Sequence, residues 1–126
     1  MEWTLSGYNP VPKQAARDMG WQWIVLGTAC TAVATGCLVP NRWLPRLPND
    51  KLLHFTAFGG IAALALPLAG SRTEAALWLI GLLVASGAIE CLQELVPGRH
   101  FCWRDLAANA AGIGLVALCA LLYGAM

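Results

Sequence analysis

Four long apolar segments dominate this chain, and none of them contains a lysine or an arginine. They cover residues 21–39, 52–70, 75–96 and 106–126. A helix needs about 20 apolar residues to cross the hydrocarbon core of a bilayer, so each segment is long enough to span a membrane. Charged residues make up only 12% of the chain, which is about half of their share in soluble domains. We therefore predict an all-α integral membrane protein, a bundle of four transmembrane helices.

A soluble four-helix bundle is the main alternative to a membrane protein. The helices of such a bundle carry polar residues every three or four positions along one face. Residues 75–89 read AALWLIGLLVASGAI and residues 110–126 read AAGIGLVALCALLYGAM, both without a charge. Polarity is therefore confined to one end of these segments instead of one face, and this pattern favours a lipid environment.

The chain before the first apolar segment is polar and contains prolines. Residues 1–18 are predicted to form a leader at the membrane interface, and residues 19–126 to form the transmembrane domain. A cleaved signal peptide is an alternative interpretation, because basic residues precede the apolar run and the sequence AVA within it resembles a cleavage site. The run continues to Val39, however, which favours an uncleaved first helix.

Three connections join the four predicted helices. The first contains three prolines, which exclude a continuous helix, and Asn49 or Asp50 is expected to cap the second helix. The second connection, SRTE, is so short that helices two and three must form an antiparallel hairpin, with Thr73 as the N-cap. Asp105 is expected to cap the fourth helix. Because the chain crosses four times, both termini lie on one side, and the first and third connections share the opposite face.

The basic residues do not decide which face of the membrane this is. The first and third connections hold Arg42, Arg46, Lys51, Arg99 and Arg104, against Lys13, Arg17 and Arg72 on the opposite side. Counting all of them places the first and third connections in the cytoplasm. If Lys51 and Arg99 belong to a binding site instead, the two sides carry equal numbers and the orientation is left open.

Polar residues from three helices are expected to meet at the face of the first and third connections. They are Asp50, Lys51, His54, Glu90, Gln93, Arg99, Asp105 and Asn109. Glu90 lies seven residues before Pro97, which places it about 10 Å inside the end of its helix. An ionisable residue at that depth is normally turned into the bundle and paired. His54 and Arg99 are the available partners of Glu90.

This set of residues is suited to binding an anion. Lys51 and Arg99 beside two helix N-termini would hold a phosphate headgroup, and we assign Asp50, Gln93 and Asn109 to the binding site with them. Glu90 or Asp105 would act as a base or as a ligand of a divalent metal that bridges to the phosphate, and His54 would transfer a proton. No nucleophile motif such as a serine with a placed histidine is present, so an enzymatic activity is left open.

Each of these assignments has a structural alternative. Glu90 can instead form a buried ion pair that fixes the register of the helices. Asp50 and Asp105 can serve only as N-caps, and His54 and Asn109 can simply hydrogen-bond between helices. Five cysteines show no zinc-ligand spacing, so we expect no structural disulfide, no bound metal and no cofactor.

Four short motifs in this order resemble the VanZ-like family of small bacterial membrane proteins. They are DKLLHFTAF at 50–58, IECLQ at 89–93, PGR at 97–99 and DLAANAAG at 105–112. The resemblance implies a multi-pass protein of the bacterial cytoplasmic (inner) membrane and an association with resistance to teicoplanin and related glycopeptide antibiotics. It places the polar signature of the family on the residues named above and on Gly112, and it supplies no biochemical activity.

Two functions are consistent with these observations. The first is a one-sided polar pocket that binds the anionic headgroup of a membrane lipid or of a lipid-linked cell-envelope precursor. The second is a non-catalytic accessory or assembly subunit, in which the polar cluster only clamps the helices and the partner is another membrane protein. A transporter is disfavoured because four helices without an inverted repeat provide little for alternating access. No nucleic-acid partner is expected.

Overall fold

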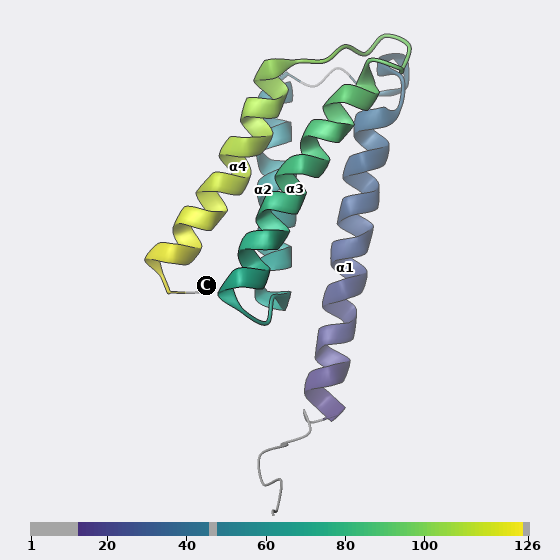
Figure 1. Cartoon of the computed structure of the whole chain (residues 1–126). Coiled ribbons are helices and arrows are strands. Elements are labelled where there is room, and N and C mark those ends of the chain that lie inside the picture. Colours follow the sequence, from purple (N-terminus) through teal and green to yellow (C-terminus); the bar gives the residue numbers. More distant parts are fainter. Residues whose placement is uncertain (1–12, 46–47, 125–126) are drawn as a thin grey trace, which may run out of the picture.

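The computed structural model describes residues 13–45 and 48–124, with side chains from residue 20 onward. This part of the chain is helical and contains no strand. The elements are α1 (Lys13–Leu38), η1 (Asn41–Trp43), α2 (Asp50–Ala65), η2 (Leu66–Leu68), α3 (Arg72–Gln93) and α4 (Trp103–Leu122), where η denotes a short 3₁₀ helix (Figure 1). Helices α1, α3 and α4, and α2 together with η2, provide four segments that are long and apolar enough to cross a membrane. The predicted all-α membrane bundle is confirmed.

The leader predicted at residues 1–18 lies largely outside the described residues. Residues 1–12 are not among them, whereas α1 already begins at Lys13. The last part of the predicted leader is therefore helical and continuous with the first span. This helix ends just before Pro40, whose ring cannot continue it, and the 3₁₀ turn of η1 follows.

The helix caps agree only in part with the sequence prediction. Asn49 caps α2 as expected, since its Oδ1 accepts a hydrogen bond from the backbone N–H of Leu52 at 3.2 Å. The prediction that Thr73 caps α3 was wrong. The N-cap is Ser71, which has an extended backbone and whose hydroxyl accepts a hydrogen bond from the N–H of Glu74. The prediction that Asp105 caps α4 was also wrong. Helix α4 begins two residues before Asp105, and the Asp105 side chain is directed to α2 instead.

The closest helix contact lies between α2 and α4, where two glycines face each other. A Cβ at Gly112 would overlap the carbonyl oxygen of Phe55, and a Cβ at Gly59 would lie 3.2 Å from the carbonyl oxygen of Gly112. Small residues allow this approach in lipid, where no hydrophobic force drives helices together. Phe58 and Ile113 are buried beside the crossing and form the core there. The first turns of α2 and α4 are consequently held next to each other.

Helix α1 lies at the edge of the bundle beside α3 (Figure 1). None of the residues in the most apolar stretch of its span is buried. Val33 contacts the core, and Trp23 packs edge-to-face against Trp78 of α3. The start of α1, the turn between η2 and α3, and the end of α4 lie at one end of the bundle, while η1 and the connection from α3 to α4 lie at the other (Figure 1). This is the arrangement expected from counting crossings.

Candidate functional site

Polar side chains are buried together at the end of the bundle where α2 and α4 begin and α3 ends. The buried members are His54 (α2), Glu90 and Gln93 (α3), and Asp105 and Asn109 (α4). Glu90 and Asn109 have no exposed surface at all. The predicted site residues are therefore brought together by three helices, although their contacts differ from those expected.

Lys51 and Asp105 form an ion pair that joins the first turns of α2 and α4. The ammonium group also lies 3.7 Å from a carboxylate oxygen of Asp50 and 3.8 Å from the sulfur of Cys102. The side chain of Asp105 is only 10% exposed, whereas that of Lys51 is 44% exposed. Lys51, predicted to hold an anion, already has its charge compensated by a carboxylate of the protein.

His54 lies between this ion pair and the interior of the bundle. Its Nδ1 is 3.0 Å from Oδ1 of Asn109, and because an amide oxygen can only accept, Nδ1 carries the proton. Nε2 faces Asp105 Oδ2 at 3.6 Å and Asp50 Oδ1 at 3.8 Å, both beyond hydrogen-bond distance. The imidazole is thus oriented by Asn109, with its second nitrogen turned towards two carboxylates.

Glu90 is the most deeply buried charged group of the described residues. Its Oε1 is 3.9 Å from Nδ1 of His54, so one of its two predicted partners is adjacent. Neither of its carboxylate oxygens accepts a well-formed hydrogen bond from the described residues, although the backbone of Cys102 is close enough to stabilise its charge. An ionised carboxylate in this position is costly unless it is compensated.

Arg99, the other predicted partner of Glu90, is directed to the end of α1. It donates from Nε to the carbonyl of Val39 at 3.1 Å and from Nη2 to that of Gly36 at 2.9 Å. Gln93 donates to the neighbouring carbonyl of Cys37 at 2.9 Å. These donors satisfy carbonyls that a helix C-terminus leaves without intrahelical partners. This role of Arg99 was not predicted from the sequence. The available signal was that the last turn of α1 contains no basic residue of its own, so the carbonyls at its end need donors from elsewhere in the chain.

A partly open cavity of about 930 Å³ lies between α1, α2 and the two connections at this end. Its wall is apolar and is formed by Ala32, Val33, Leu53, Ala57 and Phe58, among others. Its polar end includes Asp50, His54, Gln93, Arg99 and Asp105, and its rim includes Asn41, Arg42 and His100. Glu90, Lys51 and Asn109 do not line it.

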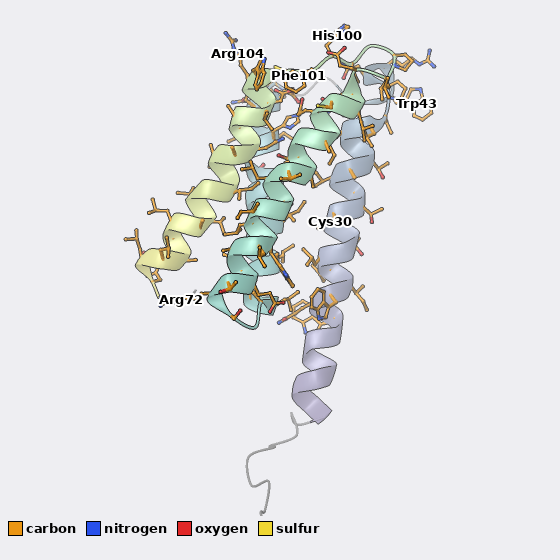
Figure 2. All side chains as sticks on the ribbon, in the orientation of Figure 1. Cys30, Trp43, Arg72, His100, Phe101 and Arg104 are labelled. Atoms are coloured by element: carbon orange, nitrogen blue, oxygen red, sulfur yellow. The ribbon has the colours of Figure 1, made fainter. Side chains whose placement is uncertain are left out.

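The rim of the cavity was not predicted from the sequence. Asn41 Nδ2 donates to the carbonyl of Gly98 at 3.0 Å and thereby ties the first connection to the third. Figure 2 shows His100 and Trp43 at this same end of the bundle, with Arg72 at the opposite end. The motif NRW follows directly after Pro40 in the first connection, and PGRH lies in the third. Because these two connections share one face of the membrane, their common location was the signal that could have indicated the rim.

Three lining residues also have the composition of a metal site. Asp50, His54 and Asp105 each offer one ligand atom, and these atoms lie within 4.8 Å of one another. No bound metal was predicted from the cysteine spacing, and only Glu90 or Asp105 was considered as a carboxylate ligand of a metal. Asp105 follows the other two by about 50 positions in the chain, so the group is formed only by the packing of α4 against α2.

Comparison with known proteins gives one finding. A family model described as VanZ/LLP1 matches residues 4–124 of the chain, which is almost its full length. Searches of curated proteins and of solved structures found no match.

Proposed function

The chain belongs to the VanZ/LLP1 family, and we propose that it binds the anionic headgroup of a membrane lipid or of a lipid-linked cell-envelope precursor. The cavity between α1 and α2 carries this proposal. It is polar at the end of the bundle where the connections lie and apolar along its wall. A ligand with a charged head and a hydrocarbon tail matches both parts, and the volume of about 930 Å³ is within the range of small-molecule sites.

Two arginines provide the positive charge that such a headgroup requires. Arg42 is exposed at the rim and forms no ion pair or hydrogen bond with any described residue. Among the described residues, Arg99 donates only to neutral carbonyl oxygens, so none of their carboxylates compensates its charge. Guanidinium groups bind phosphate through paired hydrogen bonds. The anion is therefore assigned to Arg42 and Arg99, in place of the pairing of Lys51 with Arg99 expected from the sequence.

The apolar wall explains why the ligand would be a lipid and not a free anion. Val33 of α1 and Leu53 and Ala57 of α2 line the cavity below its polar end. These positions belong to membrane-spanning segments. A hydrocarbon tail bound between α1 and α2 would therefore exchange its contacts with bilayer lipids for contacts with apolar side chains, at little cost in free energy. The loose contact of α1 with the bundle leaves room for the tail.

Lipid retention by the purified full-length protein tests this proposal. The protein is reconstituted into nanodiscs of phosphatidylcholine containing either phosphatidylglycerol or a long-chain isoprenyl diphosphate, re-extracted, and its bound lipid is measured by native mass spectrometry. Arg42→Gln is expected to weaken binding about fivefold, which corresponds to about 1 kcal/mol for an exposed charged pair. The lipid that Arg42→Gln affects more identifies the headgroup class.

Arg104→Gln is the matched control for this experiment. Arg104 is also an exposed arginine at the same end of the bundle (Figure 2), but it does not line the cavity. Removing it changes the net charge equally and should leave lipid retention unchanged. Equal retention by the wild type and both variants, or equal losses in the two variants, would refute binding at this cavity.

A non-catalytic accessory or assembly subunit is the second candidate function. It is favoured by the bonds from Lys51 to Asp105 and from His54 to Asn109, which join α2 to α4 and would clamp the bundle. In that case Asp105→Asn lowers the melting temperature of the protein, and Arg42→Gln alters neither melting nor lipid retention. Under headgroup binding, Arg42→Gln lowers lipid retention with no change in melting.

A further inference from the structure

Asp50, His54 and Asp105 present one nitrogen and two carboxylate ligands at the polar end of the cavity. We infer that these three side chains bind a divalent transition-metal ion. Lys51 holds Oδ1 of Asp105, which leaves Oδ2 facing Nε2 of His54 at 3.6 Å. Each of the three residues thus contributes an atom that is not hydrogen-bonded to another described residue.

The balance of charge around Glu90 points to a bound cation. Asp50, Glu90 and Asp105 are three carboxylates, and Lys51 and the imidazole of His54 are the only basic groups within 4 Å of any of them among the described residues. Glu90 is fully buried, its Oε1 lies 3.9 Å from Nδ1 of His54, and neither carboxylate oxygen accepts a well-formed hydrogen bond from the described residues. Asp50 is 54% exposed, but Glu90 and Asp105 are buried. Lys51 pairs with Asp105, so the Glu90 carboxylate has no lysine or arginine partner among the described residues, in a region where uncompensated charge is strongly unfavourable. A divalent ion supplies the missing charge.

The orientation of His54 is the one found in metal-binding histidines. Such a histidine usually donates its other ring N–H to an oxygen acceptor, which fixes the tautomer and turns the lone pair to the metal. Here Nδ1 donates to Asn109 at 3.0 Å, and the carboxylate of Glu90 lies 3.9 Å from the same nitrogen. Asn109 and Glu90 therefore act as positioning residues for His54.

The distances between the ligand atoms suit a first-row transition ion after a small adjustment. Ligands about 2.1 Å from zinc in a tetrahedral site lie about 3.4 Å apart. Nε2 of His54 is 3.6 Å from Asp105 and 3.8 Å from Asp50, so these two pairs need shifts of a few tenths of an ångström. All three ligand atoms lie within 4.8 Å of one another, so rotation of the exposed Asp50 side chain has to close a gap of at most about 1.4 Å to Asp105. Imidazole with carboxylates favours Zn²⁺ or Mn²⁺, and the adjoining cavity leaves a coordination position open to water or to an anion.

This site is distinct from the arginines assigned to the headgroup, so it is tested independently of lipid binding. The full-length protein in detergent is stripped with a chelator and titrated calorimetrically with Zn²⁺ and, separately, Mn²⁺, and its metal content is measured after dialysis. One ion per chain is expected for at least one of the two metals. Asp50→Asn is the informative variant, because Asp50 is 54% exposed and its loss should not prevent folding.

Glu94→Gln is the matched control. Glu94 is an exposed carboxylate at the same end of the bundle whose Oε1 accepts from the N–H of Phe101, and glutamine keeps that acceptor. Asp50→Asn is expected to weaken metal affinity at least about tenfold, and Glu94→Gln to leave it unchanged. Equal affinities in the two variants, or well below one ion per wild-type chain for both metals, would overturn the inference.

Substitution with Co²⁺ distinguishes the inferred ligands from a nearby thiol. Cys102 lies beside Lys51, with 3.8 Å between Sγ and Nζ, and is the competing ligand at this end. The inferred site contains only nitrogen and oxygen donors, so the Co²⁺ protein should show d–d absorption without a thiolate charge-transfer band. A thiolate band that disappears in Cys102→Ser would assign the ion to the cysteine and refute the site.

Discussion

Replacing Gly112 with alanine tests whether the close crossing of α2 and α4 builds the polar cluster. A Cβ at this position would overlap the carbonyl oxygen of Phe55 and lie 3.1 Å from the backbone nitrogen of Gly59. Both neighbours are backbone atoms, so no side-chain rotation relieves the contact and the two helices must separate. Overpacking of this kind costs about 1 to 3 kcal/mol, and rigid neighbours place Gly112→Ala near the upper end of that range.

The separation of the helices also disrupts the site. The ion pair of Lys51 with Asp105 and the hydrogen bond of His54 with Asn109 both bridge α2 and α4. A 3.0 Å hydrogen bond that lengthens by about 1 Å is lost. Gly112→Ala is therefore expected to lower stability and metal affinity together, although Gly112 is neither one of the three inferred metal ligands nor part of the lining of the cavity.

Thermal melting of the full chain in detergent measures the effect. Gly114→Ala is the control, because a Cβ there meets nothing within 4 Å and alanine is the better helix former by about 0.5 to 1 kcal/mol. Gly59→Ala should be intermediate, with its nearest contact at 3.2 Å. We expect Gly112→Ala to melt about 10 °C below the wild type. If it melts at or above Gly114→Ala, the argument from the helix crossing is wrong.

Two further predictions concern Arg99, which is partly buried, and Glu90, which is fully buried. Arg99→Ala removes the two donors that bind carbonyls at the end of α1, so the contact between that end and the bundle should loosen. Spin labels on α1 and α3 would report this as a broader distribution of distances. Arg104→Ala should leave the distribution unchanged, and an unchanged distribution in Arg99→Ala would contradict the contact. Glu90→Gln removes a fully buried carboxylate that accepts no well-formed hydrogen bond from the described residues. In the presence of a chelator, the variant should therefore be more stable than the wild type by about 1 kcal/mol or more. Added Zn²⁺ or Mn²⁺, whichever the wild type binds, should then stabilise the wild type more than the variant, and equal stabilisation would argue against Glu90 as a positioning residue.

The sequence by itself determined the membrane-spanning architecture of this protein. Length and composition were sufficient for the four spans, because a bilayer imposes a fixed number of apolar residues on any helix that crosses it. Counting crossings was sufficient to place residues far apart in the chain, such as His54 and Asn109, at one end of the bundle. Local chemistry was less decisive, since Asn49 was correctly assigned as a cap while Thr73 was not.

Only the tertiary structure decided which of these residues bind one another. Lys51 pairs with Asp105 and Arg99 binds the end of α1 because of how each helix is rotated and tilted. Helices that are apolar on every side carry no periodic stripe from which that rotation can be derived. In this protein the rotation of α2 and α4 is fixed where Gly59 meets Gly112, and that contact brings Asp105 beside Asp50 and His54.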